Sequence, residues 1–66
     1  MKLRINGQEH VMTDQTTVRG VLNQLGFGEK PVVVELNQHA LFPREHETTM
    51  LHEGDTMEIV QITAGG

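Results

Sequence analysis

The chain has 66 residues, a formal net charge of −4 and no cysteine. Its length allows one hydrophobic core and one domain, and the lack of cysteine excludes disulfides, thiolate zinc sites and a side-chain sulfur nucleophile. A small domain without disulfides suits the reducing cytosol, so we expect a cytoplasmic protein. No apolar run reaches the roughly 18 residues of a membrane helix, and five scattered cations disfavour nucleic-acid binding.

The N-terminal stretch predicts a β-hairpin. Residues 2–5 alternate polar and apolar side chains, as a half-buried strand does. Asn6-Gly7 then gives the strongest short-range hairpin signal, because a type I′ turn needs positive φ at both central residues. We expect the return strand over residues 8–12, with Met12 inward and His10 partly buried beside it.

A single helix is predicted next. Thr17 is a suitable N-cap, and Gly26 stands where a left-handed C-cap belongs. Apolar side chains recur at i, i+3, i+4 and i+7 and form one helix face, made of Val18, Val21, Leu22 and Leu25. Gly20 lies inside this helix, where it costs about 1 kcal/mol relative to alanine.

Two further strands follow the helix. Residues 32–36 form a β-branched run after Pro31, and Asn37-Gln38 turns the chain. Residues 39–42 can form a short strand, which Pro43 ends because it has no amide proton to donate.

The last third of the chain predicts one long strand. Residues 44–50 look irregular, with at most one helical turn, and residues 53–55 form a tight turn. The alternation in residues 56–61 then predicts a strand with Glu58 and Val60 pointing outward.

The order hairpin, helix, strand, short strand, strand predicts an α+β fold. One main helix covers one face of a mixed sheet of four to five strands, and the first and last strands lie side by side in its centre. This is the ubiquitin-like β-grasp arrangement, which we assign to residues 1–62, with residues 63–66 as a flexible tail. The expected core consists of Leu3, Ile5, Met12, Val18, Val21, Leu22, Leu25, Val34, Leu36, Met57 and Ile59. The open sheet face should carry Arg4, Val33, Glu35, Glu58 and Val60.

The tail itself, Thr63-Ala64-Gly65-Gly66, permits two interpretations. Terminal glycines fray easily, so the tail could be without function. Alternatively, it is an accessible α-carboxylate, since a chain without Cβ atoms can lie in a channel too narrow for other residues. That carboxylate has a reference pKa of roughly 3.5 and would be ionised.

The sequence gives little support for catalysis or metal binding by this chain. The chain contains no serine, which removes a serine nucleophile. The four histidines, His10, His39, His46 and His52, lack metal-ligand spacing, so we expect no metal site and interpret the last three as ordinary surface residues. We expect neither an enzyme nor a bound cofactor.

The whole chain resembles the bacterial sulfur carriers of thiamine biosynthesis. The motifs that carry this resemblance are Asn6-Gly7, Thr17-Val18, Leu36-Asn37-Gln38, Pro43-Arg44-Glu45, Glu53-Gly54-Asp55, Ile59-Val60-Gln61 and the terminal glycines. The related small subunit of molybdopterin synthase shares the fold and the Gly-Gly end. It usually runs longer and has aromatic residues and prolines before the tail, which residues 59–64 lack.

The resemblance implies a mechanism centred on Gly66. An activating enzyme of the ubiquitin-activating type uses ATP and magnesium to adenylate its carboxylate. Sulfur from a persulfide donor, such as a cysteine desulfurase, then displaces AMP and leaves a thiocarboxylate. Thiazole synthase uses this sulfur to form the thiazole of thiamine. The carrier, expected to be a monomer, is thus a substrate, with Gly65, Ala64 and Thr63 as the rest of its reactive tail.

Partner contacts are expected beside the tail. We expect Val60 and Ile62 on the open sheet face to touch partners, together with Glu58 and Arg44. Acidic residues between Glu53 and Glu58 should steer the approach of a basic partner. Two other functions stay open at this point: a β-grasp interaction module without a reactive tail, and a modifier that is conjugated to protein lysines.

Overall fold

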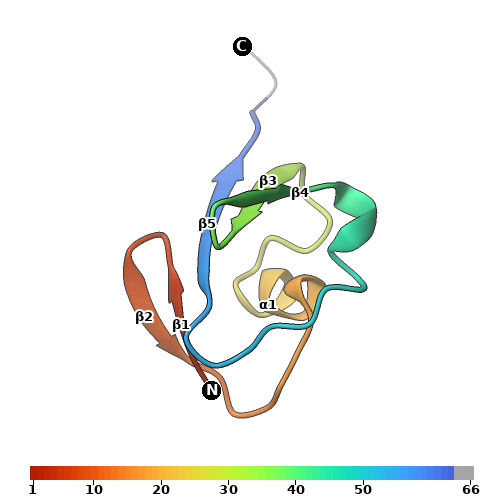
Figure 1. Cartoon of the computed structure of the whole chain (residues 1–66). Helices are drawn as coiled ribbons and strands as arrows, with labels where there is room; N and C mark the ends of the chain where they lie inside the picture. Colours follow the sequence, from red (N-terminus) through yellow and green to blue (C-terminus); the bar gives the residue numbers. More distant parts are fainter. Residues whose placement is uncertain (64–66) are drawn as a thin grey trace.

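The computed structural model describes residues 1–63, which form a five-stranded sheet with one α-helix across one face (Figure 1). The elements are β1 (Lys2–Ile5), β2 (Gln8–Val11), α1 (Val18–Gln24), β3 (Val32–Leu36), β4 (His39–Leu41), the 3-10 helix η1 (Pro43–Glu45) and β5 (Thr56–Gln61). The strand order is β2-β1-β5-β3-β4, with β1 and β5 parallel and the other pairs antiparallel. The predicted β-grasp fold is confirmed, including the central, adjacent first and last strands.

Both hairpins turn at an asparagine that also holds β5 in place. The backbone φ is 51° at Asn6 and 50° at Asn37, which is the left-handed region that asparagine tolerates. Asn6 Oδ1 accepts a hydrogen bond from Ile59 N at 2.7 Å, and its Nδ2 donates to Ile59 O at 3.2 Å. Asn37 Oδ1 accepts from Thr56 N at 3.0 Å. The two turns thus fix the strand that leads to the tail.

The helix begins and ends where the sequence predicts. Thr17 is the N-cap, and its Oγ1 accepts from Gly20 N at 3.1 Å. Leu25 is the C-cap, and Gly26 follows with a φ of 88°. Among residues 1–63 no helix is long and apolar enough to cross a membrane.

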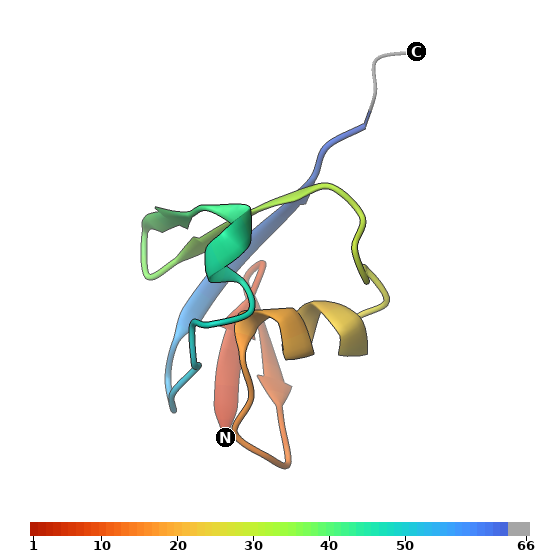
Figure 2. The same cartoon turned by 90° about the vertical axis from the view of Figure 1, so that its right-hand side faces the viewer.

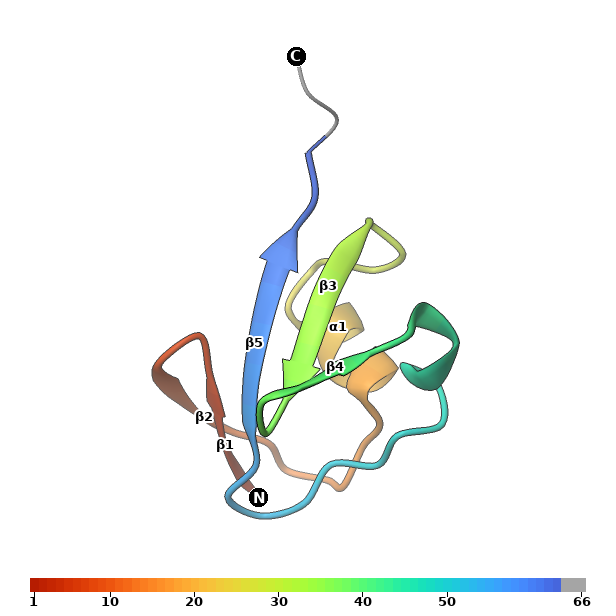
Figure 3. The same cartoon turned by 45° about the horizontal axis from the view of Figure 1, so that its top comes forward.

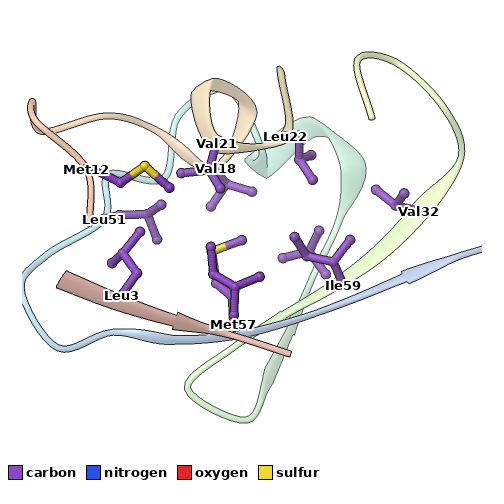
Figure 4. Packing of buried hydrophobic residues seen from close by; sticks show 11 residues of the cluster. Leu3, Met12, Val18, Val21, Leu22, Val32, Leu51, Met57 and Ile59 are labelled. Atoms are coloured by element: carbon purple, nitrogen blue, oxygen red, sulfur yellow. The ribbon is translucent and has the colours of Figure 1, made fainter. Parts of the chain in front are cut away.

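The core lies between α1 and the sheet (Figure 4). Nine of the eleven expected core residues are buried, while Leu25 and Leu36 are half-buried and pack against the cluster. Two buried apolar residues were not in the expected set: Val32, at the start of β3, and Leu51, which lies in no helix or strand and is 0% exposed.

Backbone hydrogen bonds explain why Leu51 is buried. Leu51 N donates to Thr16 O at 2.9 Å, and Val18 N donates to Thr49 O at 3.0 Å. These bonds hold the connection between η1 and β5 against the start of α1, as Figure 2 shows. The connection between η1 and β5 thereby covers the part of the core beside the N-terminus of α1, which the sheet alone leaves open.

Gly20 differs from the expectation for a helix glycine. A Cβ atom at this position would overlap Oγ1 of Thr16 and lie 3.2 Å from the Thr16 Cβ. Close packing against the Thr16 side chain therefore disfavours a larger residue here, whereas helix propensity alone favours alanine.

We expect Gly20→Ala to destabilise the domain by about 1–3 kcal/mol, the usual cost of overpacking, although it improves helix propensity. Urea unfolding at 25 °C measures the change. The double variant Thr16→Ala/Gly20→Ala should recover most of the loss, because it removes the atoms that collide. A single Gly20→Ala variant more stable than the parent would contradict the packing argument.

Candidate functional site

β5 carries the chain from the middle of the sheet to the tail. It pairs with β1 on one side, and on the other with β3 over the full register from Leu36↔Met57 to Val32↔Gln61. β5 runs past the start of β3 and leaves the sheet at that end (Figure 3). Within residues 1–63, the backbone bond nearest the tail runs from Ile62 N to Pro31 O at 2.9 Å, and Thr63 is exposed. The tail therefore leaves from a rigid central strand.

Three exposed apolar side chains form a row across the open face, here called the apolar row: Val60 on β5, Val33 on β3, and Phe42 just after β4. Val33 is the direct partner of Val60. Continuing the β3–β4 register one residue past Val34↔Leu41 places Phe42 on the other side of Val33. Their exposed fractions are 61% for Val60, 42% for Val33 and 60% for Phe42. Contiguous exposed apolar surface of this kind is typical of a contact site.

Charged residues border the apolar row. Arg44 extends it beyond Phe42, with its guanidinium carbon 4.7 Å from the centre of the Phe42 ring, a cation–π contact. Glu58 and Glu35 are direct cross-strand partners, two residues along β5 and β3 from the Val60–Val33 pair, and both are exposed. Like charges directly opposite each other are unfavourable in a sheet, so this pair would gain from a cation on a partner. Glu58 and Val60 point outward as predicted.

Ile62 stands past the end of β5 and is 51% exposed. It also lines a surface hollow of about 220 Å³, which the prediction did not include. We call this the tail hollow; its lining residues are Arg19, Glu29, Lys30, Pro31, Val32, Pro43, His46 and Ile62. Since α1, η1 and the buried Val32 contribute to it, the hollow opens on the helix side.

His46 is buried, contrary to the prediction. We expected an ordinary surface histidine, but only 2% of His46 is exposed. Arg19 N donates to its carbonyl oxygen at 2.7 Å, which draws the residue after η1 against α1. Burial lowers the pKa of His46 below its usual 6.5, the Arg19 charge lowers it further, and Glu45 opposes both. His46 is therefore neutral at pH 7.

This shifted pKa predicts a loss of stability in acid. Below pH 6.5 the unfolded chain binds a proton at His46 that the folded chain, with its lowered pKa, does not yet bind. Unfolding free energy should therefore fall as the pH drops from 6.5 through the folded-state pKa, and the same slope should be absent in His46→Gln. Melting temperatures between pH 7.5 and about 5 measure this. His39→Gln, at an exposed histidine, is the control and should keep the slope; equal slopes in both variants would contradict the assignment.

The remaining predicted site residues are placed only in part. Thr63 is exposed, while Ala64, Gly65 and Gly66 lie outside the described residues, so the role of the terminus stays a prediction. Across residues 1–63, no three His, Asp or Glu side chains gather in a group that could hold a metal ion.

Phe42 is the site residue that sequence reasoning missed. The alternation in residues 39–42 puts Leu41 inward and Phe42 outward, so the signal was present. Its neighbour in space, Val33, could be recognised only from the register between β3 and β4.

Comparison with known proteins agrees with this architecture. The sequence matches the ThiS family over residues 3–66. The crystal structure of a thiamine biosynthesis protein (ThiS) from Geobacter metallireducens superposes with a TM-score of 0.84 at 28% identity, covering 100% of both chains. The chain is also 34% identical over 62 residues to the uncharacterized protein ycf40 of Trieres chinensis, covering 94% of this chain and 85% of that protein.

Two longer proteins also match. The chain is 35% identical over its 66 residues to a thiazole synthase from Magnetococcus marinus and, equally, to one from Paramagnetospirillum magneticum. It spans 20% of the length of each. The match over nearly the whole chain and the shared fold lead to one conclusion: this chain belongs to the ThiS family, as its resemblance to the sulfur carriers of thiamine biosynthesis predicted.

Proposed function

We propose that this chain is a sulfur carrier whose C-terminal carboxylate, on Gly66, is converted to a thiocarboxylate that supplies sulfur for the thiazole of thiamine. The observation that carries the proposal is the family match over residues 3–66, which includes the Gly-Gly end. The position of β5 supports it, because a central strand paired on both sides presents the tail from a fixed point.

The chemistry explains why a separate activating enzyme is required. A carboxylate resists attack by a nucleophile, whereas an acyl-adenylate has AMP as a good leaving group. The Gly66 carboxylate attacks the α-phosphorus of ATP and releases pyrophosphate, and a persulfide sulfur then displaces AMP. A second thiol cleaves the sulfur–sulfur bond and leaves the thiocarboxylate. ATP and magnesium act in the activating enzyme, so the carrier itself needs only an accessible terminus.

The partners follow from the same proposal. The thiazole synthases of two bacteria contain a stretch similar to this whole chain, which supports thiazole synthase as the enzyme that receives the sulfur. An adenylating enzyme and a persulfide donor complete the set. We place their docking on the apolar row, with Arg44 and Glu58 at its border, because this surface adjoins the strand that leads to the tail.

A direct test is intact mass spectrometry of the carrier. The chain is incubated with a cognate adenylating enzyme, ATP, magnesium and a persulfide donor, and each component is omitted in turn. Replacement of one oxygen by sulfur on the C-terminal peptide, dependent on ATP, would establish the carrier function. Isopeptide adducts on lysines of other proteins would instead indicate a modifier. No change at the terminus under any condition would refute the proposal.

Val60→Asp should weaken binding to the adenylating enzyme by about tenfold or more, since it puts a charge into the proposed contact, at the end of the apolar row nearest the tail. Stability should change little, because Val60 is 61% exposed. Calorimetric titration measures the affinity, and a melting curve measures the stability. Val11→Asp is a matched control: Val11 is 70% exposed but lies on β2, outside the apolar row. Equal affinity losses in both variants, or none, would place the docking face elsewhere.

A further inference from the structure

The side chain of Asn6 takes the place of a backbone partner that β1 is too short to give β5. β1 ends at Ile5, and the next backbone bond, from Asn6 N to Met57 O at 2.9 Å, is followed by the turn into β2 (Figure 1). Two residues further along β5, Asn6 Oδ1 accepts from Ile59 N and Asn6 Nδ2 donates to Ile59 O. One carboxamide thus pairs a backbone N–H and a backbone C=O of β5. We call these two hydrogen bonds the Asn6 lock.

Ile59 depends on the Asn6 lock. Backbone groups along a strand point alternately to its two sides, and those of Ile59 point toward the hairpin, where Asn6 is the partner. Ile59 is only 5% exposed, so solvent is a poor substitute for the lost bonds. The Asn6 lock therefore holds the part of β5 that lies between the hairpin turn and the tail.

The residue that forms the lock is also the chemically least stable asparagine of the chain. A backbone nitrogen can attack the side-chain carbonyl carbon of a preceding asparagine and close a five-membered succinimide ring. A side chain on the attacking residue hinders this approach, and Gly7 has none. Gly7 is exposed, and its N–H has no hydrogen-bond partner among residues 1–63. The other two asparagines, Asn23 and Asn37, are each followed by a glutamine.

We propose that Asn6 is a deamidation site that the Asn6 lock keeps closed, so that the native contact protects the residue that makes it. Ring closure forms a bond between Gly7 N and Asn6 Cγ and breaks the bond between Cγ and Nδ2. Ammonia leaves with the proton that Gly7 N gives up. Water then opens the ring at either carbonyl, which gives aspartate or isoaspartate at position 6.

The lock protects because ring closure requires motion of the side chain and the backbone. The Cα–C and Cα–Cβ bonds of Asn6 must rotate until Gly7 N faces Cγ. In the folded chain the two bonds to Ile59 hold the carboxamide, and the two-residue turn holds the backbone, with a φ of 51° at Asn6 and 82° at Gly7. Loss of two hydrogen bonds of ordinary net strength makes the open form about tenfold rarer or more.

Neither product of the reaction restores the lock. Aspartate has an oxygen in place of Nδ2, and an ionised carboxylate cannot donate to the carbonyl of Ile59. Isoaspartate adds a carbon atom to the main chain of the turn and leaves its carboxylate directly on Cα. The two-residue loop that sets the Ile5↔Gln8 pairing is then lost. Deamidation should therefore loosen the strand that leads to the tail, whether or not the tail carries sulfur.

Peptide mass spectrometry of the full chain measures the reaction. The chain is aged at one mildly alkaline pH, in buffer and in guanidinium chloride that unfolds it. Exchange of the Asn6 amide for a carboxyl group reports deamidation, and methylation by an isoaspartate methyltransferase identifies isoaspartate. We expect Asn6 to react about tenfold faster or more in the unfolded chain. Equal rates in the two conditions would overturn the protective lock, and an unfolded chain that stays intact at Asn6 would overturn the site.

Asn37 is the internal control for this measurement. It also has positive φ, 50°, and its Oδ1 also accepts from β5, at Thr56 N. Gln38 follows it, so ring closure is hindered even without the native contact. Asn37 should therefore remain intact while Asn6 reacts in the unfolded chain. Similar loss of both amides would show that direct hydrolysis replaces attack by Gly7, and would overturn the mechanism.

Hydrogen exchange tests the lock itself. Asn6→Gly removes the carboxamide and keeps a residue that tolerates positive φ. In the ¹⁵N-labelled chain, exchange of the Ile59 amide relative to that of Leu22 in α1 should be about tenfold faster or more, and this ratio can be read even if the variant is less stable overall. Asn37→Gly is the matched control, because Asn37 bonds to Thr56 and not to Ile59.

The aged chain completes the comparison. After purification with isoaspartate at position 6, it should show the same fast exchange at Ile59 as Asn6→Gly, while Asn37→Gly keeps the exchange ratio of the parent. Parent-like exchange in both Asn6→Gly and the aged chain would overturn the lock. These experiments use the isolated chain, so their outcome is independent of the sulfur-transfer assay.

Discussion

Addition of one alanine after Gly66 is expected to abolish thiocarboxylate formation while leaving the fold intact. An extended residue is about 3.3–3.6 Å long, so the new carboxylate would lie one residue beyond the α-phosphate of ATP. A misplacement of about 1 Å can already cost roughly a hundredfold in rate. Deletion of Gly66 should fail for the same reason, because the carboxylate would then fall short. Intact mass spectrometry of the complete sulfur-transfer reaction gives the readout.

The control variant for this experiment is Thr63→Ala. Thr63 is exposed, and the substitution keeps the length of the tail and both glycines, so sulfur transfer should proceed. All three proteins should melt like the parent, because the described core ends at Ile59 and β5 ends at Gln61. Sulfur acceptance by the extended protein would show that the terminus is not the reacting group, and would favour an interaction module in its place.

The sequence predicted the parts of the fold that local rules decide. Asn6-Gly7 and Asn37-Gln38 specify tight turns because their backbones tolerate positive φ, and all four residues have it. Thr17 and Gly26 bound the helix through a side-chain cap and a left-handed backbone. Alternation in residues 56–61 assigned the two faces of β5 correctly. Each of these signals is read within a few residues.

The errors occur where distant segments decide the outcome. Leu51 and His46 lie in a stretch without a hydrophobic period, and they are buried because backbone bonds to Thr16 and Arg19 draw this stretch onto α1. The hollow that Ile62 lines also depends on distant segments, since α1 and η1 contribute to it. At position 20 a larger residue would collide with the Thr16 side chain, and helix propensity does not describe this contact.

The candidate site divides in the same way. The outward position of Val60 was predicted from alternation, whereas the reactivity of the tail stays a prediction from chain order. The place of Phe42 beside Val33 and the tail hollow were not predicted, because both depend on how β3, β4 and η1 are arranged in space. The apolar row and the tail hollow therefore depend on long-range contacts, which local sequence patterns do not describe.

Leu51→Ala is expected to be among the most destabilising single substitutions, although no secondary-structure pattern marks this residue. Its side chain is 0% exposed, and Figure 4 places it near Leu3 and Met12 in the core. Removing a buried leucine side chain costs about 2–5 kcal/mol. A domain of this size has a total stability of roughly 3–10 kcal/mol, so much of the protein would unfold. Leu22→Ala, on the buried helix face, should cost a similar amount.

Urea unfolding at 25 °C measures both variants, with Met50→Ala as the neighbouring control. Met50 is 42% exposed and precedes Leu51 in the same connection, so its truncation should cost well below 1 kcal/mol. If the connection were only a loop over a finished core, Leu51→Ala would behave like Met50→Ala and only Leu22→Ala would destabilise. A large loss at Leu51 with little loss at Met50 would instead show that this irregular connection is as much a part of the core as the helix opposite the sheet.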